Sequence, residues 1–144
     1  MKRYAYSIFC DDIRNEVNGK ASFMGVVGSL LYVNTFPCVL PKLCILITAM
    51  TDNENPFREL SFKVLVDDES AFDVKLGPEE VKQLYQNQGL IDDPKGFAAQ
   101  VMVTISPLNL EKPCKIKVVV MADDENIECA GLQISLAPEG TVLV

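Results

Sequence analysis

The sequence predicts an all-β protein: an antiparallel two-sheet sandwich of immunoglobulin-like kind, with about eight strands and one short inserted helix. Apolar and polar residues alternate with period two along most of the chain, as in half-buried strands. Turn-forming residues recur at short intervals, so most connections are too short for parallel crossovers. With 144 residues, of which 49% are hydrophobic, the chain can bury a core as a single domain over residues 1–144.

Eight segments carry the strand pattern. In chain order they are residues 3–10, 21–34, 43–50, 60–66, 71–76, 97–106, 115–122 and 127–136. In the first, Tyr4, Tyr6, Ile8 and Cys10 share one face. Residues 11–20 are polar and contain Asn18-Gly19, a strong turn signal. The second segment is long for one strand, and its glycines at positions 25 and 28 indicate a bulge or bend.

The third segment, residues 43–50, is apolar on both faces, which is typical of a central strand. A proline-marked turn over residues 36–41 precedes it, and a polar loop over residues 51–58 follows. The fourth segment alternates again, and residues 67–70 turn the chain into the short fifth strand. We therefore expect a hairpin after the central strand.

The period changes once, after residue 76. Pro78, Glu79 and Glu80 fit the first turn of a helix, where a missing N–H costs nothing and the helix dipole favours acids. Val81, Leu84 and Tyr85 share a face, and Gly89 is a typical end signal. This pattern predicts one helix of about three turns.

The last three strands have their apolar residues on one face each. Residues 107–113 are expected to form a connection, and residues 123–126, Asp-Asp-Glu-Asn, a four-residue hairpin loop. No internal repeat or inter-domain linker interrupts the pattern, so one domain remains the prediction.

Composition excludes several classes of function. The chain has no histidine, which removes the usual protease triads and most zinc sites. Its formal charge is −7 and its pI about 4.5, whereas a nucleic-acid binder needs surplus lysine and arginine. Neither the glycine pattern at residues 25–28 nor any other matches a phosphate loop or nucleophile elbow. We therefore expect no enzyme, no cofactor and no nucleic-acid partner.

The sequence also favours a cytoplasmic protein. The N-terminal apolar stretch is short, polar-interrupted and ends at Asp11-Asp12, unlike a signal peptide. Residues 21–41 carry no charge, but their glycines, asparagine and prolines fit two strands better than a membrane-spanning helix. An odd number of cysteines cannot all pair, and none forms a Cys-x-x-Cys motif; they are Cys10, Cys38, Cys44, Cys114 and Cys129. We expect reduced, partly buried thiols.

Acidic clusters are the most concentrated polar feature, and all fall in predicted loops. If neighbouring strands alternate in direction, the loops after the first, third and seventh strands lie at one end of the sandwich. The carboxylates there would be Asp11, Asp12, Asp52, Asp123 and Asp124. Calcium takes six to eight oxygen ligands, so these residues are candidates for a cation site; solvated turns are the simpler interpretation.

Two further groups of residues are candidates for binding surfaces. Tyr4, Tyr6 and Tyr32 could form an aromatic surface, or could pack their rings at strand edges with wet hydroxyls. The terminal residues Thr141, Val142, Leu143 and Val144 favour a strand and carry no charged side chain. Such a tail either folds back as an edge strand or adds to the sheet edge of a second copy and builds a homodimer.

Residues 9–28, followed by Phe36-Pro37 and residues 40–44, resemble an uncharacterised family of short bacterial and bacteriophage proteins. The shared features are a strand ending in Cys-Asp-Asp, a Gly-Lys after an acidic turn, a "Gly-Val-Tyr-Gly"-like step, a "Phe-Pro…Leu-Pro-Lys" turn and a closing Leu-Ala-Pro; here they are Cys10-Asp11-Asp12, Gly19-Lys20, Gly25-Val26-Val27-Gly28, Phe36-Pro37 with Leu40-Pro41-Lys42, and Leu136-Ala137-Pro138. Val27 departs from the aromatic residue of the pattern. The resemblance implies a small sandwich in a bacterial or prophage setting and nothing catalytic.

These observations together predict a non-enzymatic protein that acts through protein–protein contacts, with another protein or with itself, and without membrane binding. Three alternatives stay open at this stage. They are a phage-encoded inhibitor of a host defence or regulatory system, a calcium-dependent binding module, and a hydrolase that uses carboxylates alone.

Overall fold

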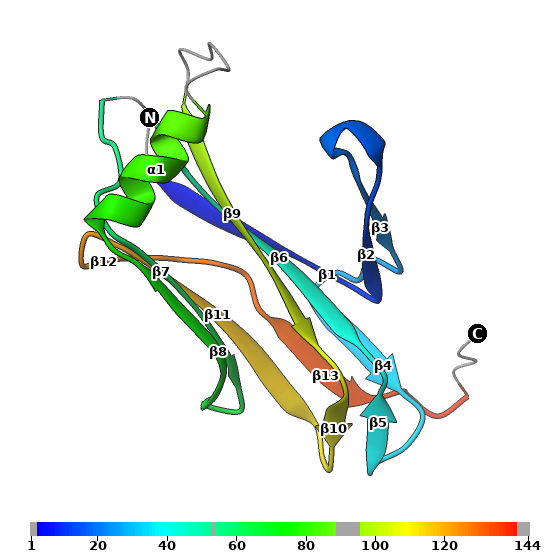
Figure 1. Ribbon diagram of the computed structural model, residues 1–144. Helices are drawn as coiled ribbons and strands as arrows, with labels where there is room; N and C mark the ends of the chain where they lie inside the picture. The colour runs from blue at the N-terminus through cyan, green and yellow to red at the C-terminus, as the bar shows by residue number, and fades with distance from the viewer. Residues whose placement is uncertain (1–2, 53, 89–95, 141–144) are drawn as a thin grey trace.

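The computed structural model describes residues 3–52, 54–88 and 96–140, which form mostly β-strands with one α-helix (Figure 1). The strands are β1 (Tyr4–Cys10), β2 (Asp12–Asn15), β3 (Ala21–Met24), β4 (Leu30–Val33), β5 (Cys38–Leu40), β6 (Leu43–Thr51), β7 (Leu60–Val66), β8 (Glu69–Leu76), β9 (Phe97–Ile105), β10 (Leu108–Leu110), β11 (Cys114–Ala122), β12 (Glu125–Ile127) and β13 (Leu132–Leu136). The helix α1 spans Pro78–Gln88, and a 3-10 turn spans Val17–Gly19.

The strands form four sheets. One has the order β1-β6-β9, and the largest has the order β4-β13-β11-β7-β8, with β12 paired to β11. The other two are the two-stranded pairs β2–β3 and β5–β10. All pairings are antiparallel except that of β4 with β13, which is parallel.

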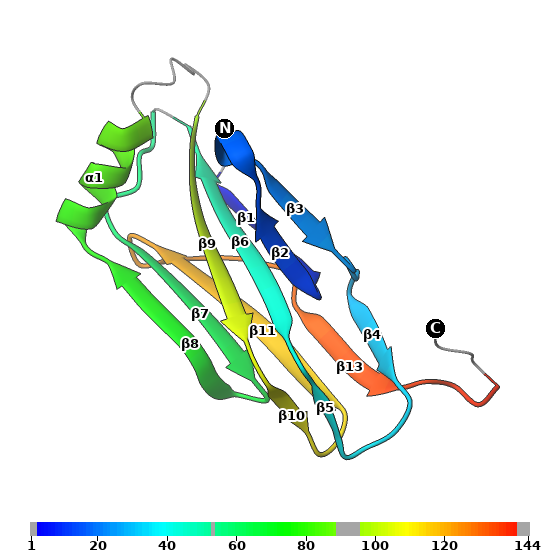
Figure 2. The same cartoon turned by 45° about the vertical axis from the view of Figure 1, so that its right-hand side comes forward.

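The two larger sheets contribute to one hydrophobic core (Figure 2). Ile45, Ile47 and Val103 come from the three-stranded sheet, and Phe62 and Ile116 from the larger one; all are at most 3% exposed. Each of these residues alternates with residues of the opposite face along its strand, as the pleat requires. The helix adds Val81, which is 1% exposed, to the end of this core.

Four sheets with one parallel pairing replace the predicted two antiparallel sheets. Part of the reason is that residues 21–34 are not one strand: β3 pairs with β2, and β4 joins the largest sheet. Between them Gly25 has a φ of +68°, and a Cβ at this position would collide with the Asp11 carboxylate. The chain therefore bends at Gly25, in a conformation that glycine adopts without strain.

The remaining difference comes from segments that were predicted as connections. Residues 36–41 and 107–113 contain β5 and β10, which pair with each other over three residues. Each of these strands follows a proline with a cis peptide bond, Phe36–Pro37 and Ser106–Pro107. Such short strands have no readable period, so only the tertiary pairing reveals them.

Several predictions are confirmed. β6 is the central strand of its sheet, and eight of its nine residues are buried. The helix begins at Pro78 with Glu79 and Glu80 in its first turn, while its predicted end at Gly89 lies outside the described residues. Asn18 and Gly19 form a turn with φ values of 63° and 71°. No described helix is both long and apolar enough to cross a bilayer.

Candidate functional site

The outer face of the β1-β6-β9 sheet carries no charged side chain. The even-numbered residues of these strands point away from the core, because their odd-numbered neighbours Phe9, Ile45 and Val103 belong to it. The pairing register places four outward positions on each strand. They are Tyr4, Tyr6, Ile8, Cys10, Cys44, Leu46, Thr48, Met50, Ala98, Gln100, Met102 and Thr104. In a chain with 23% charged residues, such a face is unusual for a solvated surface.

Large side chains stand out from this face. Tyr4, Tyr6 and Met102 are 44%, 42% and 50% exposed. Between them Leu46 and Thr48 are buried although they lie outside the core. The centre of the face is therefore shielded from solvent, and its rim offers aromatic rings and a thioether to a partner.

Two pairs of polar groups on the face bond to each other. Gln100 donates from Nε2 to Thr48 Oγ1 at 3.2 Å. The Cys44 thiol and the Thr104 hydroxyl form a weaker contact at 3.7 Å. Because these groups already have partners, covering the face would leave few unpaired polar atoms and would cost little desolvation energy.

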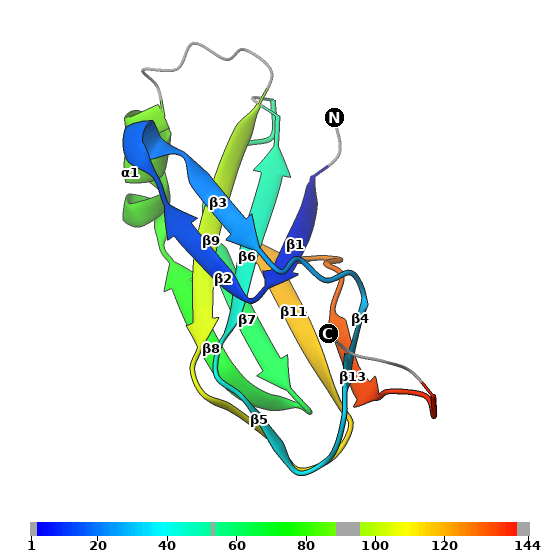
Figure 3. The same ribbon diagram turned by 90° about the vertical axis from the view of Figure 1, so that its right-hand side faces the viewer.

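The hairpin β2–β3 leaves the sheet at the end of β1 and extends in front of this face (Figure 3). Its base is fixed by backbone hydrogen bonds, from Asp11 N to Met24 O and from Val27 N to Phe9 O, both 2.9 Å. Ile13 and Phe23 are paired across the hairpin and half-buried, while Met24 is 38% exposed. The hairpin thus adds apolar residues beside the uncharged face.

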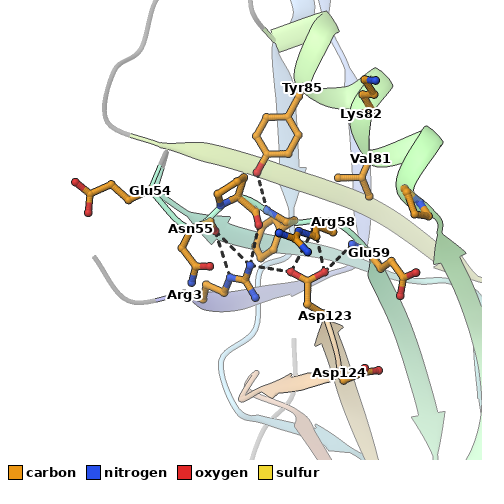
Figure 4. A pocket seen from close by; sticks show the side chains of 13 residues that line it. Arg3, Glu54, Asn55, Arg58, Glu59, Val81, Lys82, Tyr85, Asp123 and Asp124 are labelled. Carbon is orange, nitrogen blue, oxygen red and sulfur yellow. Dashed lines mark hydrogen bonds and ion pairs between the residues drawn. The ribbon is translucent and has the colours of Figure 1, made fainter.

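A concave region lies elsewhere, where α1 meets the start of β1 and the β11–β12 turn (Figure 4). It is an open pocket of about 840 Å³. At its floor the Arg3 side chain is only 6% exposed. Its Nη2 donates to Asp123 Oδ2 at 2.8 Å and to Pro56 O at 2.9 Å, and its guanidinium lies 5.0 Å from the centre of the Phe57 ring.

Aromatic contacts hold the loop before β7 against the helix. The Tyr85 ring stacks on Phe97 with 3.7 Å between centroids. The Phe57 ring meets Phe97 edge-on at 6.0 Å. Phe57 N donates to the Tyr85 hydroxyl at 2.8 Å. Burial raises the pKa of Tyr85, and the hydrogen bond from Phe57 acts against this shift.

The carboxyl group of Asp123 accepts the hydrogen bonds that join the β11–β12 turn to Arg3 and to the loop before β7. Its burial alone would raise its pKa, but hydrogen bonds from Glu59 N, from Arg3 and from Arg58 N outweigh that effect and hold the pKa below its ordinary value. The Glu59 N bond measures 2.9 Å and the Arg58 N bond 3.1 Å. Two charged groups of the pocket, Arg3 and Asp123, are therefore engaged in holding strands together.

The five candidate calcium ligands do not converge. Asp52 and Asp123 lie at the end of the molecule where β1 begins. Asp11 and Asp12 lie at the opposite end of β1, where Asp12 Oδ1 is 2.9 Å from Lys42 Nζ. The alternation fails because β1 and β6 are antiparallel neighbours, although they were counted as the first and third strands. Among the residues that the structure describes, no three acidic or cysteine side chains gather as a metal site would require.

The acidic candidates have other contacts. Asp52 Oδ1 accepts from Glu54 N at 3.1 Å and from Asn55 N at 3.0 Å, and so shapes the loop before β7. Asp124 is exposed in the β11–β12 turn beside the pocket. The prediction of a four-residue hairpin loop there is wrong, because Ala122 pairs with Glu125 and only Asp123 and Asp124 form the turn.

The tyrosine prediction is met in part. Tyr4 and Tyr6 lie on the uncharged face, whereas Tyr32 lies on β4, at the other sheet, and is 38% exposed. The predicted tail, Thr141 to Val144, lies outside the described residues.

Sequence reasoning missed Leu46 and Met102, although the lack of charge at even positions of both segments was a readable signal. It also missed Arg3, for which no local pattern exists.

All five cysteines are free thiols; Cys10, Cys44 and Cys114 are buried, and Cys38 and Cys129 are partly so. Cys10 and Cys44 are direct neighbours across β1 and β6. Burial, together with the neighbouring Cys44, raises the pKa of Cys10, so its thiol stays protonated at neutral pH.

Comparison with known proteins gives one match. The model of a family of unknown function (DUF6941) matches residues 5–135, which is most of the chain. No curated protein matches, and no solved structure does either.

Proposed function

The chain belongs to DUF6941, a family of unknown function, and from this starting point we propose that it is a non-enzymatic protein-binding domain. Its contact surface is the uncharged outer face of the β1-β6-β9 sheet. The observation that carries this proposal is that twelve outward positions on three adjacent strands include no charged residue.

The other large sheet supplies an internal comparison. Its outward residues on β7, β8 and β11 include Lys63, Asp73, Lys75, Lys115 and Lys117. A solvated sheet face normally has this composition, with charges that keep it in water. The two faces belong to one chain, so overall composition does not explain the difference between them.

The composition of the uncharged face suits protein recognition. Tyrosine and methionine are enriched in protein interfaces, and charged residues are depleted at the interface centre. Tyr4, Tyr6 and Met102 project from a rigid sheet, so little side-chain order is lost on binding. The pocket near α1 supports a binding role less well, because Arg3 and Asp123 are already committed to internal contacts.

We propose that the protein binds its partner in the cytoplasm of a bacterium or of a phage-infected host cell. We also propose that its two large sheets are arranged as in an immunoglobulin-like sandwich. The partner is either a component of an assembly or a host protein that the domain inhibits. Neighbouring genes separate these two roles, since virion-assembly genes favour the first and defence-inhibitor genes the second.

A photo-crosslinking pair tests the proposed surface. A photoreactive phenylalanine analogue replaces Tyr6 in one protein and Tyr32 in another, in cells that express each at native level. The two tyrosines are a matched pair, because they are 42% and 38% exposed and lie on different sheets. We expect discrete protein adducts from position 6 and none from position 32.

A charge placed on the face provides the second arm. Met102→Glu should abolish the adducts of position 6, while Lys117→Glu on the other sheet should preserve them. Met102 is half-exposed, so its replacement should leave the thermal midpoint nearly unchanged. Equal adducts from positions 6 and 32, or adducts that survive Met102→Glu, would contradict the proposal.

A further inference from the structure

Strand β8 is the last strand of the largest sheet, and no described strand pairs with its outer edge (Figure 2). Residues Phe72 to Leu76 pair with β7 in regular register, with one irregularity between the Val64 and Leu65 positions of β7. Phe72, Val74 and Leu76 face the core, while Asp73 and Lys75 point outward and are exposed. A free edge of this kind is a template for pairing with another strand.

The five residues Phe72-Asp73-Val74-Lys75-Leu76 are self-complementary. An antiparallel pairing of this segment with a second copy, with Val74 on the two-fold axis, sets Asp73 opposite Lys75 of the other copy. By symmetry it also sets Lys75 opposite the other Asp73, and Phe72 opposite Leu76. We propose that β8 is a self-association edge, through which two copies of this chain join their largest sheets into one continuous sheet.

The charges favour this register over shifted ones. In the paired sheet each Asp73 lies between Lys63 on its own β7, its present cross-strand neighbour, and Lys75 of the partner copy. Opposite charges directly across antiparallel strands are stabilising, and like charges are destabilising. A shift by one residue to either side would place apolar residues opposite charges, and side chains on the wrong face.

Lysines at sheet edges usually prevent pairing. Here Lys75 has Asp73 two residues away, so the edge is matched in charge to a second antiparallel copy of β8 and mismatched to a strand without this spacing. The irregularity of β8 involves Ala71, which precedes the complementary segment and leaves its five residues straight. Five residue pairs make a small interface, so the dimer should depend on concentration.

Charge exchange tests the register. Asp73→Lys places lysine opposite Lys75 of the partner copy, and Lys75→Asp places aspartate opposite Asp73. Each variant alone should therefore be monomeric. An equimolar mixture of the two should dimerise, because the positive side chain introduced by Asp73→Lys then faces the negative side chain introduced by Lys75→Asp. The double variant Asp73→Lys with Lys75→Asp should dimerise by itself.

Sedimentation velocity from low micromolar to millimolar concentration measures these masses against the 15.9 kDa of one chain. Thermal midpoints verify that each variant is folded. Lys115→Asp is the control, since it makes the same charge change on the same sheet away from β8, and it should dimerise like the unmodified protein.

Three results would overturn the proposal. They are a monomer at every concentration in the unmodified protein, a dimer that both single variants retain, and single variants whose mixture stays monomeric. A dimer that Met102→Glu abolishes and the β8 variants preserve would assign self-association to the uncharged face instead. That last result would contradict the β8 self-association edge and would remain consistent with the uncharged face as a protein-binding surface.

Discussion

The same dipeptide, Asp-Asp, makes two turns at opposite ends of the β7–β11 pair. Asp67-Asp68 joins β7 to β8 and Asp123-Asp124 joins β11 to β12. Both turns have positive φ at both residues, 47° and 68° in one and 51° and 68° in the other. In each, the first aspartate accepts a hydrogen bond from a backbone N–H near the start of the adjacent strand, at 2.9 Å from Lys115 N or Glu59 N.

The two turns differ in what surrounds the first carboxylate. Asp67 is exposed and bonds one backbone group of the neighbouring strand through its side chain. Asp123 has a side chain that is 26% exposed and also binds Arg3, which is 6% exposed. One turn thus contacts only the neighbouring strand β11, while the other anchors a buried cation that links β1, the loop before β7 and β11. The same turn residues therefore give the same backbone geometry, whereas the contribution of each turn to stability depends on its tertiary contacts.

Matched substitutions should show the largest effect. Asn tolerates a positive φ as Asp does, so Asp123→Asn and Asp67→Asn keep both turns while removing the charge and replacing one acceptor oxygen by an NH2 group. We expect Asp123→Asn to lower the free energy of unfolding by about 2–3 kcal/mol, because the buried Arg3 loses its closest counter-ion. Asp67→Asn should cost less than about 0.5 kcal/mol. Urea unfolding measures both, and equal losses would contradict the comparison.

The next largest effect is expected in the pH dependence of the unfolding free energy, through Asp123 of the second turn. The pKa of Asp123 is lowered in the folded protein, so its ionised form stabilises the fold above the unfolded pKa of about 4. This stabilisation is lost as the pH falls through the folded pKa. We expect Asp123→Asn to flatten the fall in unfolding free energy below pH about 4 relative to the unmodified protein. Unfolding curves between neutral and acidic pH give the slopes, and a slope of Asp123→Asn equal to that of the unmodified protein would refute this.

The smallest effect is expected at the ion pair of the first turn. Lys117 Nζ lies 3.1 Å from Asp68 Oδ1, but the two side chains are 56% and 80% exposed. Water and salt screen such pairs. Lys117→Met should therefore move the thermal midpoint by no more than about one degree. A larger fall would mean that the exposed turn carries weight comparable to that of the buried one.

The strands β7 and β11 were predictable because each alternates cleanly. Ile116, Val118 and Val120 face the core as their period requires, and so do Phe62 and Val64. Prediction failed at residues 127–136, which were expected as one strand but comprise the end of β12 and the separate β13. It also failed between residues 21 and 41, where apolar residues occur without a period. There the chain bends at Gly25, and the short β4 and β5 find partners more than sixty residues away, on β13 and β10.

For the candidate surface, the sequence shows which strand faces lack charge but not which strands are neighbours. The even positions of residues 3–10, 43–50 and 97–106 can be seen to lack charge without a structure. Which strands lie side by side cannot be seen, because a period of two identifies a face but not a neighbour. The predicted gathering of acidic loops was wrong for this reason, since it depended on strand direction alone.

Local sequence patterns were enough to predict the mostly β fold, the helix start at Pro78, the central place of β6 and chain reversals near residues 67–70 and 123–126. These depend on local periodicity and on backbone preferences, which act over a few residues. The complete fold was needed to show that three uncharged strand faces lie side by side, that Arg3 reaches Asp123 across 120 positions of sequence, and that β8 is the last described strand of its sheet. Such contacts are selected by burial and pairing of the whole chain, because no short segment contains both partners.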